Sequence, residues 1–220
     1  MLGMTTSWAR APRRPLRRLL TTAVGLALLA VPLAACGDEA PEPVASVQAV
    51  TGKSTAIKLD KDFVKALGDL GLEAGTTGGA KLTDGGSLVF PITGGNVTVF
   101  EPGEVSPYVI GQIQQEGSGL SLTAGDTTVE LTNFNVDPGV SRVYGDVTVI
   151  GKVAATSAFL FQLDGRTLKP LQTQGDTAVL EGTEVKISDV AAPLLNDTFK
   201  TDAVAAGLLV GIAKITVNTK

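Results

Sequence analysis

The chain has no histidine and a single cysteine, Cys36, among its 220 residues. Without histidine, catalytic triads of the Ser-His-Asp and Cys-His types are excluded, as are zinc and copper sites that use imidazole ligands. One cysteine excludes an intramolecular disulfide and a metal site made of several thiolates. We therefore expect a protein that is not an enzyme and that has no catalytic residue, no metal ligand and no bound cofactor.

Aromatic residues are also scarce, and the one tryptophan, Trp8, lies in an N-terminal segment with the composition of a signal peptide. Five arginines and no acidic residue precede Cys36, and an apolar run extends from Thr22 to Pro32. A positive region, a short apolar region and small residues before a cleavage site are the parts of a secretory signal. A retained membrane helix needs about 20 apolar residues, so this shorter run favours a signal peptide over residues 1–35.

The segment ends in Leu33, Ala34, Ala35 and Cys36, a sequence that resembles the lipobox of bacterial lipoproteins. In a lipobox the cysteine thiol receives a diacylglyceryl group, and signal peptidase then cuts the bond before it. The resemblance implies that Leu33, Ala34 and Ala35 are recognised by the peptidase and that Cys36 becomes the lipidated first residue. We expect the mature protein on the extracytoplasmic face of the cell membrane. An ordinary signal peptide that ends by chance in Ala-Ala-Cys is the alternative.

Loss of the signal peptide makes the protein more acidic. It removes five of the 18 basic residues and none of the 22 acidic ones, which changes the net charge from −4 to −9. The basic surface that nucleic acid requires is therefore absent, and anionic lipid headgroups repel such a domain. The predicted partners are the membrane, through the lipid, and either an unknown envelope partner or a small apolar ligand.

The sequence after the signal peptide predicts a lipidated, flexible tether over residues 36–53 and a single extracytoplasmic domain over residues 54–220. The tether is acidic, contains prolines and shows no apolar period, as is typical of unfolded linkers. The 167 residues that follow are enough to bury a core of their own.

The domain has the residue pattern of an antiparallel β protein. Apolar and polar residues alternate over 127–134 and again over 143–149, as in strands with one buried face. Similar segments recur about every ten residues, separated by turn dipeptides such as Gly94-Gly95 and Asp164-Gly165. The predicted strands are 88–92, 97–100, 108–114, 120–122, 127–134, 143–149 and 158–163. We therefore expect a mainly β, antiparallel sandwich or barrel-like domain with two short helices.

Two segments predict the helices. Asp60 is a good N-cap for a helix that ends near Gly71, a natural C-cap, and Ser188 caps a shorter helix that ends near Phe199. Residues 57–60 also match residues 185–188 in pattern, since each is a strand end and a polar cap followed by a helix. The two ends of the domain are therefore expected in comparable positions beside the central sheet.

Two pairs of acidic residues could in principle act in acid–base chemistry or bind calcium. Asp60 and Asp62 are the cap and first turn of a predicted helix, whereas Asp137 and Asp146 lie in a turn and a surface strand. No loop dense in ligands accompanies either pair. We expect structural roles for all four residues.

The two tyrosines that remain after the signal peptide, Tyr108 and Tyr144, are the candidate ligand-binding residues. A tyrosine hydroxyl is able to ligate haem iron. The alternative is that each ring packs on its strand while the hydroxyl stays in water.

Several segments resemble the HtaA-type domain, a β-rich haem-binding module of actinobacterial envelope proteins. The resembling segments are 119–123 (Gly-Leu-Ser-Leu-Thr), 127–136, 143–147 (Val-Tyr-Gly-Asp-Val), 185–199 and Ala206-Gly207. The resemblance covers residues 55–218 as a pattern. It implies a β-rich fold and a location in the cell envelope.

The haem ligands of that family are not matched here. Members typically open with a tryptophan-containing segment and a tyrosine that ligates haem with support from a histidine, whereas the opening helix predicted here offers Phe63. Tyr144 is the neighbour of Val143 along the strand and lies on the opposite face. If Val143 faces the core, we expect the ring of Tyr144 to point outward. Tyr108 directly follows Pro107 at a strand start, an edge-like place where a closed pocket is harder to build. The sequence therefore predicts that the domain does not bind haem tightly.

These features predict a lipid-anchored, non-catalytic binding or interaction module of the cell envelope. A carrier of haem or of another apolar small molecule is one alternative, and it requires a concave apolar pocket. A structural or adhesive surface protein is the other, and it would expose an apolar patch or an edge strand.

Overall fold

The computed structural model describes residues 40–219, so the predictions for the signal peptide, for Leu33, Ala34 and Ala35, and for Cys36 lie outside the described residues. The described part belongs to one compact unit that begins at Ala40. Its elements, in chain order, are β1 (Ala45–Val47), β2 (Lys53–Leu59), α1 (Lys61–Asp69), β3 (Glu73–Gly78), β4 (Lys81–Leu82), β5 (Ser87–Pro91), β6 (Gly94–Val99), β7 (Val109–Ala124), β8 (Thr127–Asp137), β9 (Arg142–Val149), β10 (Lys152–Asp164), the 3-10 turn η1 (Gly165–Thr167), β11 (Gln172–Gln174), β12 (Thr177–Ile187), α2 (Ala191–Phe199) and β13 (Leu209–Asn218).

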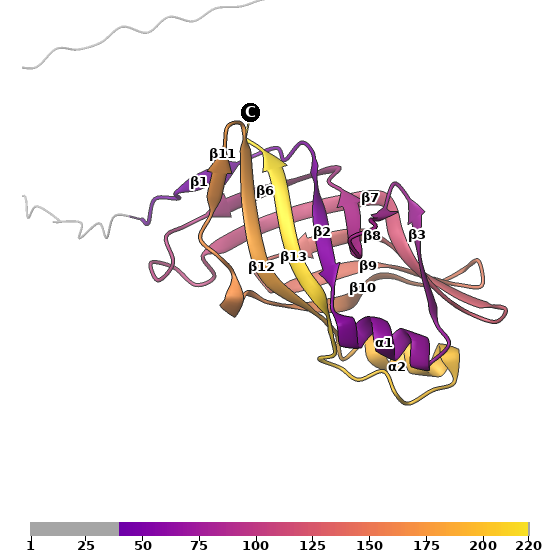
Figure 1. Cartoon of the computed structure of the whole chain (residues 1–220). Helices are drawn as coiled ribbons and strands as arrows, with labels where there is room; N and C mark the ends of the chain where they lie inside the picture. The colour runs from indigo at the N-terminus through magenta and orange to yellow at the C-terminus, as the bar shows by residue number, and fades with distance from the viewer. Residues whose placement is uncertain (1–39, 220) are drawn as a thin grey trace, which may run out of the picture. The chain divides into compact units, whose positions relative to one another are not determined.

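The strands form one antiparallel sheet. Its order is β1-β6-β7-β8-β9-β10-β12-β13-β2-β5-β4, with β11 beside β12 and β3 beside β7. Figure 1 shows the sheet curling so that β12, β13 and β2 lie across from β7, β8, β9 and β10. The predicted fold class is therefore confirmed: the domain is mainly β, antiparallel and barrel-like, with two short helices.

The curled sheet has two halves, β12, β13, β2, β5 and β4 on one side and β1 and β6 to β10 on the other. Their side chains meet in one core. Phe90 of β5 packs edge-on against Phe134 of β8 with ring centroids 5.2 Å apart, and Phe134 packs against Phe161 of β10 at 6.1 Å. The chain passes from one half to the other between β5 and β6, where Thr93 donates its N–H to the Gln114 carbonyl at 2.8 Å. Apolar burial is the main force that stabilises such a core.

A row of β-bulges crosses the sheet from β7 to β10, and we call it the crease. The strand register shifts at residues 115–119 of β7, at 132–135 of β8 and at 155–158 of β10. A bulge bends its strand and increases the local twist, so bulges that lie side by side bend the sheet along one line. The crease therefore helps to turn this sheet into a curled one.

Asn133 and Asp146 hold the crease together. Asn133 has a φ of 54°, in the left-handed region that asparagine tolerates better than most residues. Its Oδ1 accepts the N–H of Gly117 at 2.9 Å, and its Nδ2 donates to Asp146 Oδ2 at 2.9 Å. The other carboxylate oxygen of Asp146 accepts the N–H of Ser157 at 3.0 Å. Two side chains thus connect β7, β8, β9 and β10.

Replacing Asp146 with alanine should destabilise the domain by about 1–2 kcal/mol at pH 7, because two hydrogen bonds to a half-buried carboxylate are lost. The bonds from Asn133 and then Ser157 lower the pKa of Asp146 below its ordinary value. A lowered pKa means that this stabilisation is present above the ordinary pKa of an aspartate and is lost as the pH falls through the lowered one. In urea unfolding, the difference between wild type and variant should therefore shrink as the pH falls below the ordinary pKa of an aspartate.

Asp126, in the turn between β7 and β8, provides the matched control. Asp126→Ala removes the same charge from an exposed position, and it should change the free energy of unfolding by less than about 0.5 kcal/mol. If Asp146→Ala lost as much stability at acid pH as at pH 7, the carboxylate charge would not be what stabilises the crease.

The two helices occupy corresponding places in the fold. β2 and β12 lie on either side of β13, and each leads into a nine-residue helix. Asp60 Oδ1 accepts the N–H groups of Asp62 and Phe63, and Ser188 Oγ accepts the N–H of Ala191 at 2.9 Å. Asp60 is therefore the N-cap of α1, as predicted, whereas the N-cap position of α2 is Val190 and Ser188 bonds the first turn from two residues before it. Neither helix of the described residues has the length and apolar character of a membrane span.

Three of the differences between the structure and the predicted elements concern strands β1, β3 and β7. β7 is one strand of 16 residues where two were predicted, because the bulge of the crease interrupts the alternation without ending the strand. β1 lies within the predicted tether but pairs with β6, and Val50 is buried. β3 pairs with β7 although its sequence has no apolar alternation. The first strand of the sheet among the described residues, β1, therefore lies within the segment predicted as a tether.

Candidate functional site

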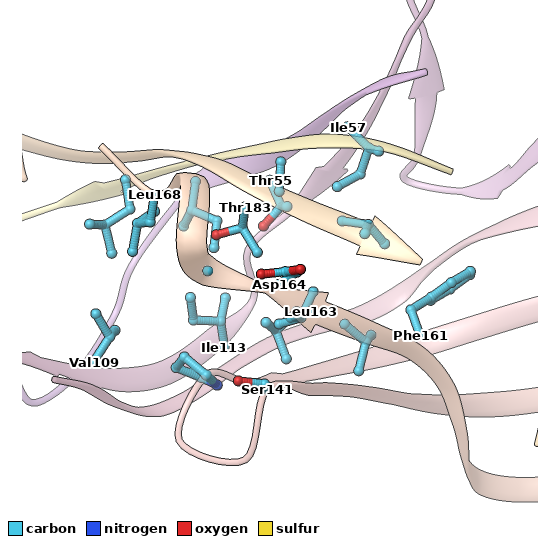
Figure 2. Close-up of a pocket in the computed structure, with 18 of the residues that line it drawn as sticks. Thr55, Ile57, Val109, Ile113, Ser141, Phe161, Leu163, Asp164, Leu168 and Thr183 are labelled. Atoms are coloured by element: carbon cyan, nitrogen blue, oxygen red, sulfur yellow. The ribbon is translucent and has the colours of Figure 1, made fainter. Parts of the chain in front are cut away.

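The curled sheet encloses a cavity of about 560 Å³ that is partly open to solvent (Figure 2). Small-molecule sites typically measure about 300–1,000 Å³, so this volume is large enough for a ligand. Side chains from both halves of the sheet line the cavity, and most of them are apolar. The apolar lining includes Ile57, Phe90, Val109, Ile113, Phe134, Val136, Val143, Phe161, Leu163, Leu168, Val185, Val210 and Ala213.

Strand alternation explains why the lining is apolar. Side chains point to opposite faces of a sheet at successive positions. Ile113 of β7, Val136 of β8 and Val143 of β9 point into the cavity, whereas Asn135 and Tyr144, each next to one of them, are half-buried and do not line it. The alternation that predicted the strands therefore also separates the cavity face from the outer face.

A glutamine and a threonine interrupt the apolar lining. Gln115 is 2% exposed and Thr55 is 4% exposed, and both line the cavity. Gln115 Nε2 donates to Thr55 Oγ1 at 2.7 Å, which joins β7 to β2 across the interior. A glutamine amide has two N–H groups and a carbonyl oxygen, and this bond uses one N–H. Neither residue was predicted from the sequence, although Gln115 faces the same side of the strand as Ile113 and so could be placed in the interior.

The charged residues of the lining are Asp164, labelled in Figure 2, and Arg166, whose side chain is 85% exposed and so marks the mouth of the cavity. Arg166 Nε and Nη2 donate to the Asp164 carboxylate at 2.9 and 2.6 Å, and Lys186 Nζ donates to it at 3.0 Å. These bonds, with that of Arg166 the strongest, hold the pKa of Asp164 well below its ordinary value. Lys186 Nζ also lies 2.8 Å from Glu184 Oε2. The four side chains form a neutral group, which we call the mouth cluster.

The structure separates the two candidate tyrosines. Tyr108 is half-buried and lines the cavity. It directly precedes β7, whose first residues pair with β6. Tyr144 lies on the outer face of β9, as its parity predicted, with its ring 6.0 Å from that of Phe159 and its hydroxyl 3.4 Å from Arg142 Nη1. Tyr108 alone of the two belongs to the candidate site.

The two acidic pairs have structural roles. Asp60 caps α1, with Asp62 in the first turn, and Asp137 accepts the N–H of Val140 in the turn after β8. Asp146 belongs to the crease instead. Within residues 40–219, no three or more side chains of histidine, cysteine, aspartate or glutamate are grouped so as to hold a metal ion.

A second cavity, of about 60 Å³, lies between the two helices and the sheet. Phe63 of α1 and Phe199 of α2 line it together with leucines, alanines and other apolar residues. Its volume is several times below the roughly 300 Å³ of the smallest typical ligand pockets. The large cavity is therefore the candidate site.

Two solved structures from Corynebacterium glutamicum share this fold. The C-terminal domain of HtaA aligns with a TM-score of 0.53 and 12% sequence identity over 79% of this chain and 98% of that one. The heme binding protein HtaB aligns with a TM-score of 0.50 and 11% identity over 79% of this chain and 96% of that one. The chain matches no family model and no curated protein. At this identity the likeness shows the fold, in agreement with the resemblance found in the sequence.

Proposed function

We propose that the domain is a non-catalytic carrier that binds a small apolar molecule in the cavity inside the curled sheet. The cavity itself carries the proposal: it measures about 560 Å³, and its lining is mostly aliphatic and aromatic. An open apolar surface of this extent in a folded interior is costly unless a ligand covers it. HtaB is described as a heme binding protein, so a protein of similar fold holds a large ligand.

We propose further that the carrier works outside the cytoplasmic membrane, attached by the lipid on Cys36. This part rests on the sequence Leu33-Ala-Ala-Cys at the end of a signal peptide. A lipid-anchored carrier would bind its ligand in the cell envelope, where apolar molecules are poorly soluble in the aqueous phase.

The direct test uses residues 37–220, the mature chain without its lipidated cysteine, which contain the whole compact unit from Ala40 onward. Native mass spectrometry of protein purified without detergent should reveal a co-purified small molecule. Nile red, an uncharged dye that brightens in apolar sites, should bind saturably with a stoichiometry of one. A dye response that does not saturate, or that persists after the protein is unfolded in urea, would contradict the proposal.

We predict that this carrier does not bind haem tightly. Proteins usually supply the axial ligand from histidine, cysteine, methionine or tyrosine, and among the described lining residues Tyr108 is the single side chain of these types. A phenolate ligand needs a nearby positive charge. Arg166, the one cation among the described lining residues, is already paired with Asp164. A haemin titration followed by absorbance should therefore show no saturable Soret shift.

The two tyrosines supply matched variants for this titration. Tyr108→Phe removes the hydroxyl at the cavity, and Tyr144→Phe removes one on the outer face. A stoichiometric Soret shift in the wild type that disappears in Tyr108→Phe and survives in Tyr144→Phe would overturn the prediction. It would also identify haem as the ligand.

A further inference from the structure

The polar groups of the cavity fall into two zones that differ in burial and charge. Gln115 and Thr55 are almost fully buried and uncharged, whereas the Arg166 side chain at the mouth is 85% exposed. We propose that the ligand is an uncharged amphiphile, with an apolar body and one hydroxyl or carbonyl group, and that the amide of Gln115 binds that group. This inference rests on the proposed function, because it concerns the same cavity.

The position of Gln115 points to a ligand. Burial of an amide in an apolar interior is unfavourable unless its hydrogen-bonding groups find partners. Thr55 accepts a hydrogen bond from one N–H of Gln115. The nearest inward-facing residues, Ile113 along β7 and Phe134 across on β8, are apolar and cannot bond the rest of the amide. A ligand hydroxyl could accept the second N–H or donate to the carbonyl oxygen, and a ligand carbonyl could accept the N–H. Gln115 thus offers a ligand both a donor and an acceptor.

The charges around the cavity exclude an ionic head group. Among the described lining residues the charged ones are Asp164 and Arg166, and they bind each other through two short bonds. Lys186 and Glu184 complete the mouth cluster, so that two cations face two carboxylates. A carboxylate or ammonium ligand would have to compete with these ion pairs or enter the buried zone with its charge unpaired, which is strongly unfavourable. A neutral head group would neither compete with these ion pairs nor bury an unpaired charge.

The experiment measures displacement of Nile red from the mature chain by four molecules that share a twelve-carbon chain. These are dodecanol, dodecane, dodecanoate and dodecylammonium, each at pH 8 and below its aggregation concentration. Dodecanol should displace the dye with an affinity about tenfold or more above that of the other three, because a site built to bond a hydroxyl discriminates against analogues without it. Equal affinities for dodecanol and dodecane, or a preference for either ion, would overturn the inference.

Gln115→Leu tests the residue itself. It keeps a side chain of similar size and should lower the affinity for dodecanol about tenfold, while that for dodecane stays within about twofold. Gln112→Leu is the matched control, since Gln112 lies on the same strand, is exposed and does not line the cavity. Thr55→Val, which removes the hydroxyl that orients the amide, should act in the same direction and serves if Gln115→Leu does not fold.

The outcomes separate the two proposals. If Nile red does not bind to the wild type, the proposed function fails and no ligand class follows. If the dye binds, and the wild type, Gln115→Leu and Thr55→Val all prefer dodecanol to the same degree, the cavity is a binding site but Gln115 does not recognise the head group. That second result would overturn the inference and leave the proposed function standing.

Discussion

Replacing Ala213 with phenylalanine should lower the affinity for Nile red and for any natural apolar ligand about 100-fold or more, because the larger ring occupies space that the ligand needs. Ala213 lies near the middle of β13, is 5% exposed and lines the cavity. Its strand has β12 on one side and β2 on the other, so the backbone has little freedom to move outward. The ring must therefore enter the cavity. A Nile red titration of both proteins measures the effect.

The variant should keep its fold, because the cavity has room for the added atoms. The thermal midpoint of Ala213→Phe should lie within a few degrees of the wild type or above it, since filling an apolar void adds contacts. Ala154→Phe, at an exposed position of β10, is the control and should bind the dye normally. Wild-type affinity in a folded Ala213→Phe protein would show that the ligand lies elsewhere.

Replacing Cys36 with alanine should abolish lipidation. Cys36 is the one cysteine of the sequence, and the diacylglyceryl group is attached through a thiol. Without the lipid the mature chain has a net charge of −9, which gives it no affinity for an anionic membrane surface. Metabolic labelling with a radioactive fatty acid should detect the wild type and leave the variant unlabelled. The variant should be found either as an uncut precursor or as a released soluble form.

A second change in the same background provides the control for this labelling. Ser46→Cys adds a thiol in β1, outside the lipobox, and should not restore the label to Cys36→Ala. Undiminished labelling of Cys36→Ala would mean that the fatty acid is attached at another residue. The lipobox interpretation would then be wrong.

The sequence predicted those parts of the fold that depend on neighbours along the chain. Alternation located β8 and β9, and the short polar side chains of Asp60 and Ser188 located the helix starts. These signals are local, because the face on which a side chain lies and the partner of a cap are set within a few residues. The prediction of two strands within β7 was wrong because a bulge interrupts the alternation of apolar and polar side chains without ending the pairing between neighbouring strands.

The cavity could not be predicted in the same way. It exists because the crease and the β5–β6 connection bring the two halves of the sheet together, and both act between residues far apart in sequence. Tyr108 illustrates the point, because its local context is typical of a strand start and its place at the cavity depends on pairing between β6 and β7. Gln115 and Thr55 are 60 residues apart and meet only after the sheet has curled.

The two ends of the strand order have a consequence for assembly. β1 has three residues and β4 has two, and β4 carries Lys81. An edge strand presents unpaired N–H and carbonyl groups to a neighbouring chain, and short or lysine-bearing edges resist that addition. At both ends of this strand order a second molecule therefore finds only a short template for pairing. These two ends thus disfavour polymerisation of a domain with a large apolar interior, whether or not a ligand fills it.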